Sequence, residues 1–363
     1  MTQKITRRQL LKYILAATAT ARLAPLLHAR ARYPGVAAAS LPQRADDWVW
    51  MGRAIHTVTF YEEPTTSSER LVTRARDESF HILEEVRAPY SAHNDLWYRT
   101  VLGYVHSAWV QPLRIYAPQS FIRDVGAWGF WGEVSQPYTE ARVAPSLQAA
   151  RQYRFYGNTV FRVLESFEDE AGTGWYKVAD DYPPRSQGNH QWVLARDLRR
   201  IPRTELSPIH PFAGDKRIAI NLTAQTLTCY ENEDPIYHTL IASGRGGNLE
   251  TPTGDMCVLL KQPSRHMSNV PYPDWPEDVP IPAPEDIFDL PGVPWVIFFD
   301  LIGSAIHGAY WHNDFGIRRS SGCVNVPCDV ARWIYRWCYP IAGYEDDFVQ
   351  STCRVGTPIS ISY

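Results

Sequence analysis

Short runs in which apolar and polar residues alternate recur along most of the chain after residue 48. Alternation with a period of two is the pattern of a strand that has one buried face. Residues 217–222 and 225–230 alternate in this way on either side of Thr223-Ala224, which predicts a hairpin. Further strands are expected over 237–242, 256–260, 294–301 and 357–363. The pattern therefore predicts a mainly β protein.

Helical periodicity is clear over residues 329–337. Apolar side chains recur there three and four positions apart, at Val330, Trp333, Ile334 and Trp337. We therefore expect few helices beside the strands.

The first half of the chain contains an internal repeat of about 80 residues. Gly52 precedes Trp97-Tyr98 by 45 positions, and Gly132 precedes Trp175-Tyr176 by 43. Each copy has an apolar strand, a loop, a Trp-Tyr strand and a further strand, and this order resembles bacterial SH3-like domains. The resemblance implies two small SH3-like barrels, at 48–118 and 128–200, that bind cell-wall peptide or position a neighbouring domain. Barrels without a ligand are the alternative.

Two proline-rich segments divide the rest of the chain. Residues 201–214 are predicted to be a linker, since 201–211 contain three prolines. The domain that follows spans 215–363. Within it, residues 262–292 are expected to lack regular structure, and Tyr272 and Trp275 could make this loop a lid over a substrate, or it could be a rigid spacer.

The N-terminal 45 residues are predicted to be a signal and tether. Arg7-Arg8 precedes a modest apolar run over residues 13–21, the pattern of a Tat export signal. It implies the Tat machinery as a partner and an extracytoplasmic location, in the cell wall or periplasm, with the signal segment as a potential membrane tether. A cytoplasmic amphipathic tail is the alternative.

The composition of the chain limits the classes of molecule that it is expected to bind. The net charge of −3 gives no strongly basic face, so we expect no nucleic acid. The 13 Trp and 20 Tyr suit carbohydrate- or peptide-binding grooves, or else fill small β cores.

All six cysteines follow residue 228, and free thiols are a liability in an exported protein. Cys338 and Cys353 flank a loop and could pair. Cys229 and Cys257 lie in strand-like runs and could face each other. The sequence does not decide between these pairings.

The residues that indicate chemistry are His307-Gly308 and, 16 positions later, Cys323. A histidine can take the proton of a thiol and return it to a leaving amine. We expect Cys323 to lie directly before the helix, where the helix dipole would favour its thiolate. Gly322 allows a tight turn, and the N–H groups beside it could form an oxyanion hole.

The combination of His307-Gly308 with Ser320-Ser321-Gly322-Cys323-Val324-Asn325 resembles the signature of YkuD-type L,D-transpeptidases. Thr251-Pro252-Thr253-Gly254 and Gln225 are similar to other parts of that family's pattern. The resemblance covers 215–363 and implies a β-sandwich-like catalytic domain with few helices, which would follow the two barrels. It also implies peptidoglycan stem peptides as acyl donor and amine acceptor, and no metal or organic cofactor.

The same resemblance assigns roles to individual residues. Cys323 would be the nucleophile, His307 the general base, and the carbonyl of Gly308 would orient the imidazole. The residues expected to shape the substrate pocket are Ser320, Ser321, Gly322, Asn325, His312 and Tyr310. Many relatives have a histidine at the position of Ser321, so a role for a second histidine is in doubt, although His312 could partly replace it. Tyr310, Trp311 and Phe315 could equally belong to the core or to the wall of the substrate pocket.

Three other functions are considered. Water in place of the acceptor amine would make the protein an L,D-carboxypeptidase, and a decayed site would leave a wall-binding scaffold. A zinc site made of His307, His312, Cys323 and Cys328 is disfavoured, because the spacings are unusual for structural zinc. The intact pair of His307 and Cys323 speaks against decay.

Overall fold

The structure is a computed structural model, and it describes residues 48–363 with the exception of 92, 182–189 and 272–280. The predicted signal and tether, Tyr272 and Trp275 lie outside the described residues. In the described part of the chain, no helix is long and apolar enough to cross a membrane.

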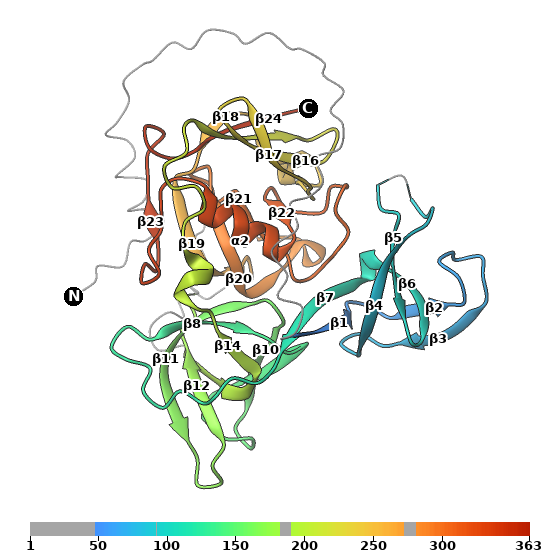
Figure 1. The fold of residues 1–363 in the computed structure, drawn as a ribbon, viewed down its shortest axis with the longest axis vertical. Coiled ribbons are helices and arrows are strands. Elements are labelled where there is room, and N and C mark those ends of the chain that lie inside the picture. Colours follow the sequence, from blue (N-terminus) through green and yellow to red (C-terminus); the bar gives the residue numbers. More distant parts are fainter. Residues whose placement is uncertain (1–47, 92, 182–189, 272–280) are drawn as a thin grey trace.

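The chain is mainly β, as predicted, and it begins with two seven-stranded sheets (Figure 1). The strands of the first are β1 (Trp48–Ala54), β2 (Val58–Tyr61), β3 (Arg70–Arg74), β4 (Ser79–Arg87), β5 (Leu96–Thr100), β6 (Gly103–His106) and β7 (Val110–Tyr116). Those of the second are β8 (Phe130–Val134), β9 (Tyr138–Arg142), β10 (Arg151–Tyr156), β11 (Val160–Glu168), β12 (Gly174–Val178), β13 (Gln191–Leu194) and β14 (Leu198–Arg200).

The two sheets have the same topology. Their strand orders are β3-β2-β6-β5-β4-β1-β7 and β10-β9-β13-β12-β11-β8-β14, so each strand of the second corresponds to the strand seven places earlier. The Trp-Tyr pairs occupy equivalent strands, β5 and β12, and both tryptophans are fully buried. The repeat seen in the sequence is thus a repeat of topology. We call the two units module 1 and module 2; their likeness to SH3 domains stays a prediction.

The C-terminal region contains two five-stranded sheets. Their strands are β15 (Lys216–Asn221), β16 (Thr226–Glu231), β17 (Asp234–Leu240), β18 (Gly254–Cys257) and β24 (Pro358–Ser362), and then β19 (Leu260–Ser268), β20 (Asp289–Phe298), β21 (Ala305–Gly308), β22 (Val324–Val326) and β23 (Val349–Gln350). The predicted hairpin is confirmed, because β15 and β16 pair antiparallel from Lys216–Glu231 to Asn221–Thr226.

The predicted helix is confirmed as α2 (Cys328–Trp337). Its Ile334 and Trp337 are buried in one core with strands of both C-terminal sheets. Two buried lysines close its C-terminal end: Lys216 donates to the Trp337 carbonyl at 2.7 Å and Lys261 to the Cys338 carbonyl at 2.9 Å. Short 3₁₀ helices lie at Ser107–Trp109, Ala195–Asp197, Arg203–Leu206, Gly247–Leu249 and Pro284–Asp286.

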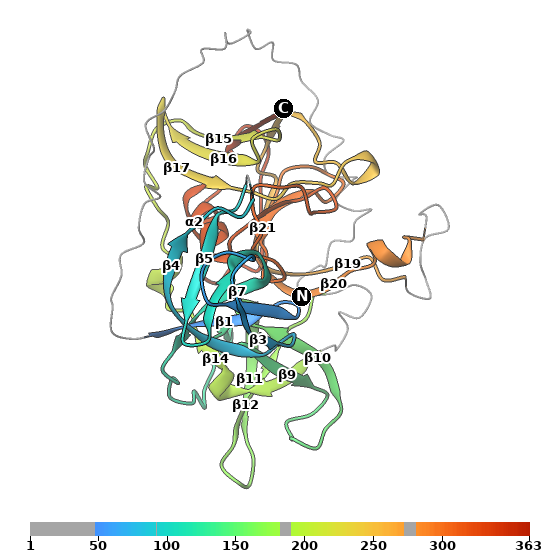
Figure 2. The ribbon, with the colours of Figure 1, turned by 90° about the vertical axis from the view of Figure 1, so that its right-hand side faces the viewer.

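The expectation of an irregular segment over 262–292 is wrong at both ends. Strands β19 and β20 pair out to Ser268–Asp289 and form a ribbon that projects from the domain (Figure 2). The expectation rested on the six prolines from Pro271 to Pro284 and on Pro291. All of these except Pro291 fall in the sequence between Ser268 and Asp289, the outermost paired residues, so they do not interrupt the ladder.

Neither expected disulfide is present. Cys257, at the end of β18, is bonded instead to Cys353, 96 residues later. Their Cα atoms lie 5.3 Å apart, because the chain around Cys353 leads into β24, the partner of β18. Cys229 and Cys338 are buried free thiols of the main core.

Module 2 shares this core with the C-terminal domain. Trp131 and Val160 of module 2 belong to the cluster that contains α2. The Trp131 indole N–H donates to the Tyr344 carbonyl at 2.8 Å. The buried Glu133 carboxylate accepts from Arg199 at 2.5 Å and lies 3.9 Å from Arg332 of α2. The two units therefore form a continuous packed body.

Candidate active site

His307 and Cys323 approach each other through one pair of parallel strands. His307 lies on β21 opposite Asn325 of β22, and Ile306 lies opposite Val324. One step further, the same register brings Cys323 beside Ala305, two positions before His307. Side chains two apart on a strand share a face, so the thiol and the imidazole lie on the same side.

The location of Cys323 corrects the expectation that it begins the helix. Strand β22 follows it directly, and α2 starts only at Cys328. The helix dipole decays within about one turn of the helix end, so it does not act on this thiol. The thiol instead points to the loop before β21, with the sulfur 3.8 Å from the Gly303 carbonyl.

The imidazole of His307 is held in one orientation by its own strand. Its Nδ1 lies 3.2 Å from the Gly308 carbonyl, which can only accept, so Nδ1 carries the proton. Nε2 is then the free acceptor of the ring. This is the contact that the resemblance implies for Gly308, and it leaves the nitrogen needed by a base unprotonated.

Burial sets the charge of both groups. It lowers the pKa of His307 to about 4, against the opposing effect of the Gly308 carbonyl. It raises the pKa of the Cys323 thiol to about 11, against the opposing effect of the Ala305 N–H. At neutral pH the resting pair is therefore a neutral thiol beside a neutral imidazole.

The backbone of Cys323 is fixed from two directions. The Ser320 hydroxyl donates to the Cys323 carbonyl and accepts from the Gly322 N–H at 3.2 Å. Thr251 donates to the same carbonyl at 3.4 Å. Gly322 has φ +112°, a conformation that favours glycine. Ser320 and Gly322 thus shape the turn that presents the thiol.

The role of Thr251 was missed in the sequence, although its motif was noted. Its hydroxyl accepts from the Gly244 N–H at 2.8 Å, so it links the chain after β17 to the cysteine turn. Gln225 supports the same chain through its bonds to Ser243, at 2.7 and 2.9 Å. Thr251 and Gln225 thus both hold the backbone at Ser243 and Gly244, which lies next to the turn that carries Cys323.

The remaining expected pocket residues lie in different environments. Asn325 and His312 are buried, and Nδ2 of Asn325 lies 2.9 Å from Nε2 of His312. Ser321 is exposed, and its hydroxyl lies 3.5 Å from Arg245 at the rim of the site. Tyr310 is 2% exposed and donates to the Pro291 carbonyl at 3.0 Å, which places it in the core rather than on an open wall.

Two further side chains lie near the pair. Arg245 gave no signal in the sequence, whereas Trp311 was expected either in the core or on the wall of the substrate pocket. Arg245 is paired with Asp286 at 2.7 Å and is exposed. The Trp311 ring lies 5.7 Å from the His307 ring. Among the residues that the structure describes, no three His, Cys, Asp or Glu side chains are grouped as metal ligands would be.

Comparison with known proteins gives a family for the C-terminal domain. Residues 215–361 match the model of YkuD, the L,D-transpeptidase catalytic domain. A search of the curated proteins gives no match.

Solved L,D-transpeptidases are also similar. A cysteine-to-serine mutant from Enterococcus faecium aligns over 42% of this chain and 51% of its own, with 20% identity and a TM-score of 0.30. An enzyme from Stackebrandtia nassauensis aligns over 44% and 62%, with 15% identity and a TM-score of 0.27. One from Mycobacterium smegmatis aligns over 56% and 99%, with 16% identity and a TM-score of 0.32. The chain thus spans about half and three fifths of the first two.

Proposed function

Because residues 215–361 match the model of the YkuD L,D-transpeptidase catalytic domain, we propose that this protein is a cysteine acyltransferase that crosslinks peptidoglycan stem peptides. Cys323 is the nucleophile and His307 the general base. The observation that carries the proposal is the shared face of β21 and β22, with the Gly308 carbonyl leaving Nε2 of His307 free to accept.

In the first half-reaction, Nε2 of His307 takes the proton of the Cys323 thiol as the sulfur attacks the carbonyl of the scissile amide. The resulting oxyanion is stabilised by backbone N–H groups of the turn next to Gly322, whose positive φ forms that turn. The intermediate collapses with loss of the terminal D-alanine amine, which receives the proton back from His307. A thioester on Cys323 remains.

In the second half-reaction, an amine of another stem peptide attacks the thioester. His307 takes a proton from that amine and returns one to the leaving sulfur. One amide is broken and one is formed, so the reaction needs no oxidant and no energy source. Water in place of the amine would give carboxypeptidase products from the same thioester.

The neutral resting pair supports a general-base mechanism over a preformed ion pair. With the pKa of the thiol near 11 and that of the imidazole near 4, proton transfer before attack is unfavourable. The proton therefore moves as the bond to carbon forms, which requires the two groups to be aligned in advance.

The proposal extends to the rest of the chain. The twin-arginine segment would export the protein to the wall or periplasm. Modules 1 and 2 would hold the catalytic domain against the wall, by binding its peptides or by positioning alone.

The test is product analysis by mass spectrometry after incubation with a disaccharide tetrapeptide. A crosslinked dimer together with free D-alanine, both absent with Cys323→Ala, is expected. A tripeptide with free D-alanine and no dimer would replace crosslinking by carboxypeptidase activity. An unchanged substrate would contradict the proposal and favour a binding scaffold.

A further inference from the structure

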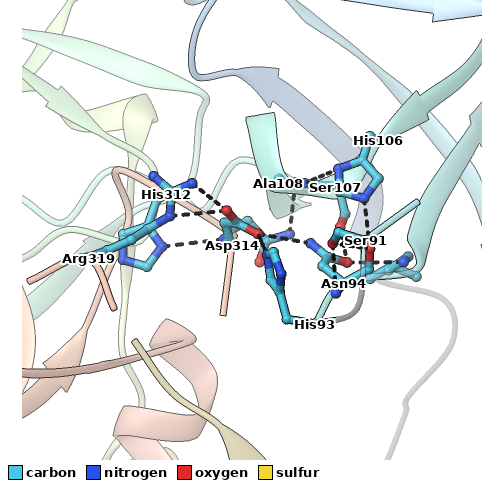
Figure 3. A network of polar contacts seen from close by, with 11 residues as sticks. Ser91, His93, Asn94, His106, Ser107, Ala108, His312, Asp314 and Arg319 are labelled. Carbon is cyan, nitrogen blue, oxygen red and sulfur yellow. Dashed lines mark hydrogen bonds and ion pairs between the residues drawn. The ribbon is translucent and has the colours of Figure 1, made fainter. Parts of the chain in front are cut away.

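The segment that joins the base to the nucleophile lies against module 1, the unit most distant from it in sequence. Residues 309–320 leave β21 after His307 and return to Cys323. Asp314, near the middle of the segment, lies 3.0 Å from Nε2 of His93 and 3.4 Å from the amide nitrogen of Asn94, both in module 1 (Figure 3). Arg319, on the returning half, donates to the same carboxylate at 3.1 Å.

Other contacts fix the segment on both sides of Asp314. Asn313 donates to the Tyr98 hydroxyl at 3.1 Å and to the Ser107 carbonyl at 3.3 Å. Arg53 of β1 donates to the Tyr310 carbonyl at 3.3 Å. Module 1 therefore contacts this segment at several points in succession.

Gly316 shows how close the two backbones are. It has φ +98°, and a Cβ at this position would lie 3.0 Å from the Cβ of His93 and 3.2 Å from its carbonyl oxygen. A side chain would push the loop of His93 away, so glycine is needed here for both conformation and contact. The close fit supports a specific docking of the two units.

From Asp314 the contacts continue into the site through His312. The Asp314 N–H donates to Nδ1 of His312 at 3.4 Å, so Nε2 carries the proton of this neutral ring and needs an acceptor. Nε2 lies 2.9 Å from the amide nitrogen Nδ2 of Asn325, while the buried amide oxygen of Asn325 has no hydrogen-bond partner. Two N–H donors cannot bond each other, so the hydrogen-bonding arrangement that suits both side chains has the Asn325 amide turned by 180°, with His312 donating to the Asn325 oxygen.

Asn325 is the last residue of this chain of contacts and lies next to both members of the proposed catalytic pair. It lies opposite His307 in the β21–β22 register and two positions after Cys323. Its backbone also exchanges both hydrogen bonds with Ala242, at 2.9 and 3.0 Å, so the position of its side chain is the remaining freedom. A shift of His312 would therefore move the Asn325 side chain, which lies beside the thiol of Cys323 and the imidazole of His307.

We propose that module 1 is a positioning element of the catalytic site: His93, through Asp314 and His312, holds Asn325 and with it the alignment of Cys323 and His307. His93, Asp314 and His312 are positioning residues, because none of them contacts the reacting atoms. The inference rests on the proposed function for the identity of the pair, but its test measures the thiol and needs no substrate.

The test is the rate at which iodoacetamide alkylates Cys323 in the full chain at pH 7.5, followed by peptide mass spectrometry. His93→Ala removes the contact with Asp314, and His93→Gln keeps a donor at a similar reach. His81→Ala is the matched control, since His81 is an exposed histidine of β4 in the same module. Thermal unfolding of each variant reports on the fold.

The expected result is a rate for His93→Ala that is about 2- to 30-fold lower, with unfolding unchanged, and recovery in His93→Gln. His81→Ala should match the wild type. A wild-type rate in His93→Ala would overturn the inference, and so would a loss that accompanies a lower unfolding temperature and is not recovered by glutamine. If His307→Ala leaves the rate unchanged, the proposed catalytic pair itself fails, which is a separate outcome.

Discussion

His307 and Asn325 lie opposite each other in the parallel pair β21–β22, and Cys323 precedes Asn325 by two positions. This register brings together the proposed base and the proposed nucleophile, which are separated by 16 residues in the sequence. The segment between them is not a free loop, because His93 of module 1 contacts it at Asp314. The segment that joins the proposed catalytic pair therefore also contacts module 1.

Replacing the nucleophile should remove activity and leave the fold intact. Cys323 is half-buried, and exchanging its sulfur for hydrogen in Cys323→Ala removes little packing. We expect no measurable D-alanine release and a free energy of unfolding within about 1 kcal/mol of the wild type. Release of D-alanine at the wild-type rate by this variant would refute the assignment of Cys323.

The pH dependence of acylation should reflect a neutral base. Burial holds the pKa of His307 near 4, so the ring stays unprotonated and active down to about that pH. The thiol, with a pKa of about 11, stays protonated through the alkaline range. The rate of D-alanine release in the first half-reaction should be constant from about pH 5 to pH 9. It should fall as the pH drops below about 5, where His307 becomes protonated. A fall centred near 6.5, the ordinary pKa of histidine, would show that the site does not perturb His307.

His307→Ala should lower the same rate by about 10² or more, the usual contribution of a general base. His238→Ala, on the exposed side of β17 and distant from the pair in the sheet order, provides a control histidine. An equal loss in both variants would contradict a specific role for His307.

Stability should fall at alkaline pH because of a buried histidine between module 2 and β20. His266 lies 2.7 Å from Asp180 and 2.7 Å from Asp289, and these hydrogen bonds raise its pKa to about 9 in spite of burial. A raised folded-state pKa gives stability that is complete below about 6.5 and is lost as the pH rises through 9. Unfolding by urea should show a loss of up to about 3 kcal/mol over this window.

The variant that tests this is His266→Gln, which cannot carry the charge. Its free energy of unfolding should vary less between pH 6.5 and 9.5 than that of the wild type. A wild type whose stability is constant over that range would rule out the predicted linkage.

The disulfide between Cys257 and Cys353 should stabilise the C-terminal domain strongly, because it closes a loop of 96 residues. Loop closure of this length stabilises by about 2–5 kcal/mol through the unfolded state. We expect dithiothreitol to lower the unfolding temperature of the wild type and to leave that of the Cys257→Ala/Cys353→Ala variant unchanged. A wild type indifferent to the reductant would show that the bond does not contribute.

Local patterns in the sequence predicted the local structure well. The hairpin of β15 and β16 and the helix α2 each follow from alternation or helical spacing within fewer than 20 residues. The repeat followed from the recurring Trp-Tyr pair, because each copy must bury the same tryptophan in the same strand. The signature around His307 and Cys323 predicted the domain for the same reason: its residues are close in sequence.

Features that depend on distant partners were missed or wrongly assigned. Strand β22 is only Val324–Val326, too short to be distinguished from the start of the helix, so Cys323 was placed at the helix. The disulfide was not among the pairings considered, because its partners are 96 residues apart and are brought together by β24. The contact of His93 with Asp314 spans 221 residues and has no local signal.

The most direct test of the account is intact-protein mass spectrometry of the full chain after a short incubation with a tetrapeptide stem that lacks an acceptor amine. We predict a covalent adduct with the mass of the tripeptide acyl group, which peptide mapping places on Cys323 and which is absent in Cys323→Ala. An adduct on another residue, or D-alanine release by the Cys323→Ala protein, would contradict the proposed mechanism.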